Sequence, residues 1–333
     1  MSSAALLNGH DALLLDLDGT VYHGARPIPG AADAIRRVRE HGTSIRFVTN
    51  NAAKAPEAVA EHLRSLGVGA EAAEVNTSAQ AAARVLRDRL PAGAEVLVVG
   101  TDSLTAQLDD AGLRPVRKAG ATVAAVVQGH SPDTAWPDLA EACLCIRAGA
   151  VWIACNMDAT LPAERGELPG NGSMVAALRT ATGREPVVAG KPRPPLFHTA
   201  AESAGAGNPL VVGDRLDTDI AGAVAAGLDA LLVLSGVDTP AGLLAAGPRE
   251  RPRYLAADLA ALPGGDAGEL EIGPRPGWRV AADGATLTAR SEGGRDSADL
   301  LRALCAGAWK HGVTSVRGTD EHARAALAEL GLT

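Results

Sequence analysis

Short apolar runs alternate with helix-like stretches along most of this chain of 333 residues. Strands that are buried on both faces of a parallel sheet read as unbroken apolar runs, and strands that alternate with helices build parallel α/β sheets. The alternation therefore predicts an α/β fold. The apolar runs are Ala12–Leu17, Ser44–Thr49, Glu95–Gly100, Ala124–Gly129, Val151–Asn156, Pro186–Gly190, Pro209–Gly213 and Ala230–Leu234. The helix-like stretches are Ala31–His41, Ala55–Leu66, Ser78–Leu90, Ser103–Ala111, Trp136–Ala148, Gly172–Thr182, Pro194–Ala204 and Asp219–Ala226.

Charge and composition argue against several classes of function. The net charge is −8 and no run of Lys and Arg stands out, so nucleic acid is not expected as a partner. No apolar run approaches ~18 residues, and no basic region followed by a long apolar stretch opens the chain, so we expect neither a membrane span nor a signal peptide. The four cysteines form no CxxC pair, as expected for reduced thiols in a cytoplasmic protein.

Polar side chains directly follow four of the apolar runs. In parallel α/β sheets, ligands bind at the carboxyl ends of the strands, so we expect these residues to meet at one edge of the sheet. They are Asp16 and Asp18 after the first run, Thr49, Asn50 and Asn51 after the second, Lys191 after Pro186–Gly190, and Asp214 and Asp219 after Pro209–Gly213.

The carboxylates in this set predict magnesium-dependent phosphoryl chemistry. Asp16 and Asp18 lie two positions apart in an extended segment and point the same way, so a bound cation or a shared proton is favoured between them. Carboxylates without His or Cys suit Mg²⁺. One carboxylate can attack phosphorus to form an aspartyl-phosphate, and another can serve as general acid and base. Lys191 supplies positive charge for the phosphoryl oxygens.

The same segments resemble, in order, the four motifs of the haloacid dehalogenase-like (HAD) superfamily. They are DLDGT at 16–20, Thr49-Asn50, Lys191, and GDRLDTD at 213–219. The resemblance implies a Rossmann-like core. It also implies phosphate chemistry rather than dehalogenation, since dehalogenases of this superfamily lack a carboxylate at the position of Asp18.

The resemblance implies a role for each motif residue. Asp16 is implied as the nucleophile and Asp18 as the general acid and base. The implied ligands of Mg²⁺ are the Asp16 side chain, the Asp18 carbonyl and Asp214, and Asp219 is implied to act through water behind them. The residues implied to bind phosphate and substrate are Thr49, Asn50, Asn51 and Lys191, and Lys191 is also implied in catalysis.

The distances between motifs predict the domain organisation. About 33 residues separate the first two motifs, which leaves no room for a cap there, whereas about 140 separate Asn50 from Lys191. The longer gap has strand and helix patterns of its own, which implies a large inserted α/β cap of the second type. This arrangement resembles the class IIA branch, which includes phosphoglycolate, pyridoxal-phosphate and nitrophenylphosphate phosphatases. We expect a core at 1–78 and 184–262, a cap at 79–183 and a Pro/Gly-rich linker at 263–277.

Residues 278–333 are expected to form a small α+β segment. They resemble part of the acetyltransferase (GNAT) fold, as in glycerol 3-phosphate phosphatases of the mycobacterial type. An acetyl-CoA site needs a Gly-rich loop at the start of a helix to receive the pyrophosphate. Gly293-Gly294 is too short and is followed by an acid. We therefore expect a structural or docking module, with a metabolite-sensing tail as an alternative.

The substrate is expected to be a small phosphorylated metabolite. Residues 156–172 resemble the specificity loop of the class IIA branch, and Asp158 and Leu161 lie within it. Pyridoxal-phosphate phosphatases carry a His near the position of Leu161, so the resemblance favours glycerol 3-phosphate. The alternatives that stay open are 2-phosphoglycolate, pyridoxal 5′-phosphate, and phosphoryl transfer to a hydroxyl instead of water. A homodimer through the cap or the tail also fits this branch.

Overall fold

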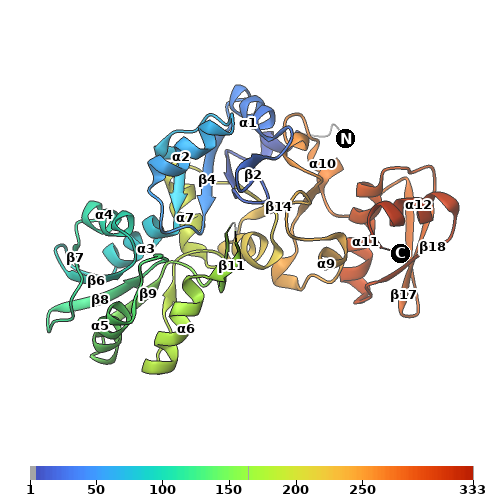
Figure 1. Ribbon diagram of the computed structural model, residues 1–333. Helices are drawn as coiled ribbons and strands as arrows, with labels where there is room; N and C mark the ends of the chain where they lie inside the picture. The colour runs from blue at the N-terminus through green and yellow to red at the C-terminus, as the bar shows by residue number, and fades with distance from the viewer. Residues whose placement is uncertain (1–4, 164, 333) are drawn as a thin grey trace. The chain divides into compact units, whose positions relative to one another are not determined.

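The computed structural model describes residues 5–163 and 165–332, which fall into two compact units (Figure 1). The first unit comprises Met1–Ile45, Leu66–Gly69 and Ala204–Thr333. The second unit comprises Arg46–Ser65 and Ala70–Ser203. Each unit is built on parallel strands, as the alternation of apolar runs and helices predicts. The α/β fold is therefore confirmed.

The first unit has a buried parallel sheet at its centre. Its strands run in the order β15 (Tyr254–Ala256), β14 (Asp229–Val233), β13 (Leu210–Gly213) and β1 (Ala12–Leu15). Every residue of β1 and β13 is buried, which explains their unbroken apolar sequences. The other elements are η1 (Leu6–Gly9), β2 (Tyr22–His23), β3 (Arg26–Pro27), α1 (Ala31–Glu40), η3 (Leu216–Ile220), α8 (Ala221–Ala226), α9 (Pro240–Leu244), η4 (Pro248–Glu250), η5 (Leu259–Ala261) and α10 (Ala267–Leu270).

The second unit contains a parallel sheet in the order β12 (Val187–Val188), β9 (Val151–Ala154), β8 (Val123–Gln128), β6 (Glu95–Val99) and β7 (Arg114–Val116). Helices α5 (Trp136–Arg147) and α6 (Asn171–Thr182) pack together on this sheet, and α3 (Ser78–Arg87) packs against α4 (Asp102–Asp110) (Figure 1). The unit also contains β5 (Val75–Thr77), most of its parallel partner β4 (Ser44–Thr49), the hairpin β10 (Thr160–Ala163) and β11 (Gly166–Pro169), α2 (Pro56–Ser65), η2 (Ala72–Glu74) and nearly all of α7 (Pro194–Ala204).

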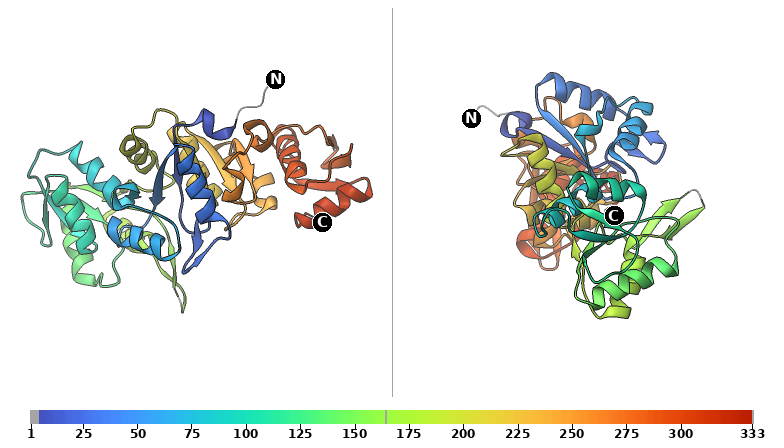
Figure 2. Two further views of the ribbon diagram at one scale, coloured as in Figure 1. Left: turned by 90° about the horizontal axis from the view of Figure 1, so that it is seen from above. Right: turned by 90° about the vertical axis from the view of Figure 1, so that its left-hand side faces the viewer.

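The C-terminal segment belongs to the first unit and has a small sheet of its own, drawn in orange to red in Figure 2. Strands β16 (Trp278–Asp283) and β17 (Thr286–Ser291) pair antiparallel, and β17 pairs parallel with β18 (Ser315–Gly318). Helices α11 (Ser297–His311) and α12 (Glu321–Glu329) pack against this sheet and against each other. The predicted small α+β segment is therefore present.

The stretch 263–277 is more than an extended connection. It contains the short helix α10, and Ile272 N donates a hydrogen bond to Arg253 O over 2.9 Å. A helix of four residues is too short to give a periodic sequence signal. The predicted domain limits stay predictions, although the division into compact units places β12, beyond the expected cap limit at 183, in the same sheet as the strands of the cap.

Within the described part of the chain, no helix is both long enough and apolar enough to cross a membrane.

Candidate active site

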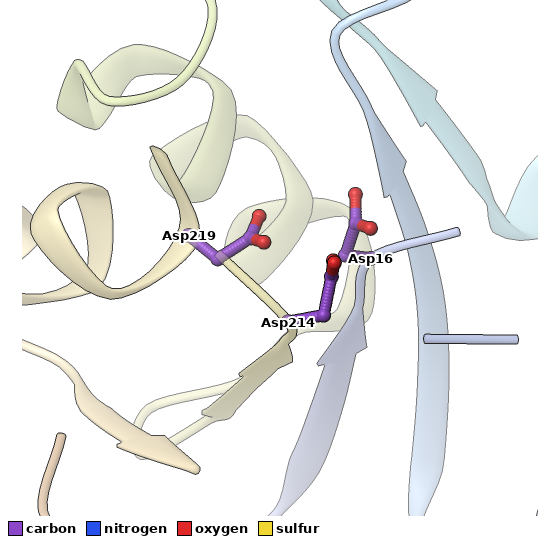
Figure 3. A group of neighbouring side chains, drawn as sticks. All are labelled: Asp16, Asp214 and Asp219. Atoms are coloured by element: carbon purple, nitrogen blue, oxygen red, sulfur yellow. The ribbon is translucent and has the colours of Figure 1, made fainter. Parts of the chain in front are cut away.

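The carboxylates of Asp16, Asp214 and Asp219 gather at the ends of two neighbouring strands of the first unit (Figure 3). One oxygen from each lies within 4.8 Å of the other two. Asp16 directly follows β1, and its backbone N–H donates to Val212 O on β13 over 2.8 Å. Asp214 directly follows β13, and Asp219 lies in the one-turn π-helix η3. The pairing of β1 with β13 thus brings together residues that lie about 200 positions apart.

Asp214 is held by the loop that follows β14. Its side chain is completely buried, and its Oδ2 accepts a hydrogen bond from Val237 N over 2.7 Å. Its backbone carbonyl accepts from Asp238 N over 3.2 Å. Asp219 is also buried, and its Oδ2 accepts from Arg215 N over 3.2 Å. The bonds from Val237 N and Arg215 N orient the two carboxylates, and the bond from Asp238 N holds the main chain at Asp214.

Glycines surround this carboxylate cluster at close range. A Cβ atom at Gly236 would lie 2.0 Å from Asp214 Oδ2, and one at Gly19 would lie 2.2 Å from the same atom. A Cβ at Gly213 would lie 2.4 Å from the Asp219 side chain. Only glycine allows such close approach. The backbone therefore closes tightly around carboxylates that would repel each other without a cation or a proton.

The donor set fits Mg²⁺. Hard carboxylate oxygens, without imidazole or thiolate in the cluster, are the ligands that Mg²⁺ prefers. Asp18 lies outside this cluster, since its side chain is exposed and its Oδ1 accepts from Gly24 N over 3.3 Å. A role for its carbonyl at the metal and for its carboxylate in proton transfer stays a prediction. So does the indirect role of Asp219, whose carboxylate is as much a member of the cluster as the other two.

The second unit brings together another set of predicted residues, centred on Asn50. Its Oδ1 accepts from Lys191 N over 2.7 Å, and its Nδ2 donates to Lys191 O over 3.2 Å. The same Nδ2 donates to the Asp158 carboxylate, at 3.2 Å from Oδ1. The Asn50 side chain thus joins the main chain at Lys191, which is 3% exposed, to the beginning of the predicted specificity loop.

A chain of buried amide side chains supports Asn50. The sequence motifs did not indicate most of these residues. Asn156 Nδ2 donates to Asn50 O over 2.7 Å. Asn171 Nδ2, at the first residue of α6, donates to Asn156 O over 2.8 Å and to Gln128 O over 3.3 Å. These contacts join positions 15 to 106 residues apart, so no local pattern reveals them. Their only signal in the sequence is an amide at the end of an apolar run.

Thr49 and Asn51 shape the turn after β4. Asn51 N donates to Thr49 Oγ1 over 3.1 Å, and Asn51 Oδ1 accepts from Ala53 N over 2.8 Å. Leu161 lies on the hairpin β10–β11 directly opposite Leu168, and the two side chains are 36% and 47% exposed. The hairpin therefore presents an apolar pair, of which the motif reading found only Leu161.

A parallel α/β core with carboxylates that suit Mg²⁺ at its strand ends is typical of a metal-dependent enzyme. Comparison with known proteins gives the family. The family described as haloacid dehalogenase-like hydrolase matches residues 13–114, and the HAD-hydrolase-like family matches residues 188–262. A GCN5-related N-acetyltransferase-like domain matches residues 275–332.

Full-length relatives agree with these matches. The chain is 47% identical over 332 residues to the D-glycerol 3-phosphate phosphatase of Mycobacterium tuberculosis, covering 96% of this chain and 93% of the relative. A crystal structure of the glycerol phosphate phosphatase of that organism in complex with magnesium superposes with a TM-score of 0.94, covering 99% of this chain and 100% of that one. The acid sugar phosphatase of Staphylococcus aureus is 40% identical, covering 69% of this chain and 88% of the relative.

This chain belongs to the haloacid dehalogenase-like hydrolase family, and it is a phosphatase. The resemblance of the four motifs to this family is confirmed.

Proposed function

We propose that this chain hydrolyses glycerol 3-phosphate with Mg²⁺ as its cofactor. The observation that carries the proposal is the cluster of Asp16, Asp214 and Asp219 at the ends of β1 and β13. The substrate is supported by 47% identity to a protein named as a D-glycerol 3-phosphate phosphatase. Leu161 also supports this substrate, because pyridoxal-phosphate phosphatases carry a His near this position and this chain has a leucine there.

In the proposed reaction, a carboxylate oxygen of Asp16 attacks phosphorus and the bond from phosphorus to the glycerol oxygen breaks. Asp18 donates a proton to the departing glycerol oxygen. Asp18 then takes a proton from water, and that water attacks the aspartyl-phosphate and releases inorganic phosphate, which restores Asp16. Lys191 neutralises charge on the phosphoryl oxygens. Mg²⁺, when held by Asp16, Asp214 and the Asp18 carbonyl, stabilises the negative charge that develops there.

Replacement of the nucleophile tests this mechanism. Asp16→Asn is expected to reduce phosphate release at least 10³-fold, because an amide cannot form the aspartyl-phosphate. Asp33→Asn is the matched control, since Asp33 is exposed on α1 and its carboxylate contacts Arg36 one turn later on the same helix. Phosphate release is measured with and without Mg²⁺ on glycerol 3-phosphate, 2-phosphoglycolate, pyridoxal 5′-phosphate and p-nitrophenyl phosphate.

Each pattern of release has a distinct meaning. Magnesium-dependent release that favours glycerol 3-phosphate supports the proposal. Preference for pyridoxal 5′-phosphate or 2-phosphoglycolate would keep the mechanism and overturn the proposed substrate. Formation of a new phosphate ester with added glycerol would indicate transfer rather than hydrolysis. Full activity in Asp16→Asn would exclude the proposed nucleophile.

We further infer that the protein works in the cytoplasm as a homodimer that forms through the cap. Free thiols at Cys143, Cys145, Cys155 and Cys305 support the compartment. The exposure of Trp136 (79%) and Leu144 (61%) on α5 supports the interface.

A further inference from the structure

Polar side chains of α11 bind the C-terminal segment to the core of the first unit. Arg302, which is 6% exposed, donates from Nε and Nη2 to Leu255 O at 3.1 and 2.7 Å, at the end of the core sheet. Trp309 donates from Nε1 to Leu243 O on α9 over 3.1 Å. Helix α11 packs along α9 and β15. The C-terminal segment is therefore fastened to two neighbouring elements of the core by bonds to their main chain.

A second contact fixes the Trp309 ring itself. The guanidinium carbon of Arg251 lies 5.2 Å from the centre of the ring, which is the geometry of a cation–π contact. Arg251 Nε also donates to Ala246 O, just beyond the end of α9, over 3.1 Å. Trp309 and Arg251 thus both bind main-chain carbonyls at or just beyond the end of α9.

Helix α9 continues directly from the loop that positions Asp214. Within this loop, Val237 N donates to Asp214 Oδ2 and Asp238 N donates to Asp214 O. Asp238 Oδ2 accepts from Leu216 N over 2.6 Å, which ties the loop to the segment that leads to Asp219. Thr239 is the N-cap of α9, and its backbone carbonyl accepts from Leu243 N over 2.9 Å. Leu243, whose carbonyl accepts from Trp309, lies six positions along the chain from Val237, whose N–H binds Asp214.

We propose that the C-terminal segment braces the magnesium site, and that Trp309 is a positioning residue for Asp214. A helix of five residues is marginal without tertiary support, so the position of α9 depends on what packs against it. By fixing α9, Trp309 fixes the loop at 235–239, and this loop orients the Asp214 carboxylate. The inference rests on the proposed function, because it needs Mg²⁺ to bind at Asp16, Asp214 and Asp219.

The chain offers a matched pair of substitutions to test the brace. Trp309→Phe keeps an aromatic ring beneath Arg251 and removes the N–H that reaches α9. Trp278→Phe makes the same change within the C-terminal segment, where Trp278 Nε1 donates over 3.2 Å to Asp296 O, an acceptor in that same segment. The dissociation constant of Mg²⁺ alone is measured by calorimetry on the full-length proteins, together with KM for glycerol 3-phosphate at saturating Mg²⁺.

Trp309→Phe is expected to weaken Mg²⁺ binding about three- to tenfold, the range expected for loss of one hydrogen bond, and to leave KM unchanged. Trp278→Phe is expected to leave the Mg²⁺ dissociation constant at the wild-type value even if it lowers the melting temperature. The brace would be overturned if both substitutions weakened Mg²⁺ binding equally, or if neither substitution weakened it.

Two further measurements keep the result decisive. Wild-type binding of Mg²⁺ and its loss in Asp214→Asn are established first, and absence of wild-type binding would sink the proposed metal site together with the brace. If Trp309→Phe does not fold, Arg251→Met tests the same contact from the core side. It is expected to weaken Mg²⁺ binding, and unchanged binding would count against the proposal.

Discussion

The Asp214 carboxylate lies so close to Gly236 that no side chain fits at position 236. A Cβ at Gly236 would lie 2.0 Å from the Asp214 Oδ2 atom, far inside van der Waals contact. The reading of strand ends found Asp16 and Asp214, because residues that follow apolar runs stand out. It did not find Gly236, Val237 or Asn171, since their importance comes from contacts with distant segments.

We expect Gly236→Ala to displace the Asp214 carboxylate and to reduce magnesium-dependent activity at least tenfold, equivalent to about 1.4 kcal/mol. The control is Gly273→Ala, because a Cβ at Gly273 meets no atom within 4 Å. Activity is titrated against Mg²⁺ for both variants. If Gly236→Ala shows the same dependence of activity on Mg²⁺ as the wild type, the loop moves aside without displacing the Asp214 carboxylate.

Asn50 offers a second test at the residue scale. Asn50→Asp places a carboxylate 3.2 Å from the Asp158 carboxylate and removes the donor to Lys191 O. The two carboxylates would repel each other, and loss of the hydrogen bond to the charged Asp158 costs about 1.5–3 kcal/mol. We therefore expect kcat/KM for glycerol 3-phosphate to fall roughly 10- to 100-fold. Asn8→Asp, at an exposed position in η1, controls for the added charge. Unchanged kcat/KM in Asn50→Asp would remove the proposed role of this side chain.

At the scale of elements, most strands and helices follow from the alternation of apolar runs and amphipathic stretches. Helix α1, for example, buries Ala31, Ala34, Ile35 and Val38, the spacing of one helical face. The sequence did not indicate α10, which is too short for such a pattern, and the predicted helix at Asp219–Ala226 covered only the end of the π-helical turn η3. Short elements are stabilised by their surroundings rather than by local propensity, so their sequences carry little signal.

The buried histidine after η1, His10, is expected to make the stability of the first unit depend on pH. His10 follows η1, is buried, and lies 3.3 Å from Asn208 O through its Nδ1. Burial lowers the pKa of His10 below its usual 6.5. The unfolded chain therefore binds this proton more readily than the folded protein. The stabilisation is fully present above pH 6.5 and is lost as the pH falls toward the lowered pKa of the folded state.

We expect His10→Gln to flatten this part of the stability profile, since glutamine does not titrate. Urea unfolding between pH 5 and 7.5 gives the free energy of unfolding for both proteins. Parallel profiles for the wild type and His10→Gln would show that another group controls the pH dependence.

At the scale of the whole molecule, the sequence indicated a core, an inserted cap and a GNAT-like C-terminal segment. The matches to known families confirm the HAD and GNAT-like parts. How the C-terminal segment is attached could not be predicted, because Arg302 and Trp309 bind main-chain carbonyls, and any residue type can supply a carbonyl. Assembly also belongs to this scale.

We expect Trp136→Glu to convert the proposed dimer into a folded monomer, because it places a charge in the apolar face of α5. Sedimentation equilibrium measures the mass of the assembly. The control is Val224→Glu, at an apolar residue that is 37% exposed outside the cap. A dimer that survives Trp136→Glu would point to the tail as the interface, and a monomeric wild type would contradict the assembly altogether.

The placement of the tryptophans has a spectroscopic consequence. Trp136 and Trp152 lie on α5 and β9 of the second unit, and Trp278 and Trp309 lie on β16 and α11 of the C-terminal segment. The core strands β1, β13 and β14 carry none. Tryptophan emission therefore reports on the second unit and on the C-terminal segment, and the strands β1, β13 and β14 contribute none of it. In a Trp136→Phe, Trp152→Phe background, the remaining emission would follow the C-terminal segment alone.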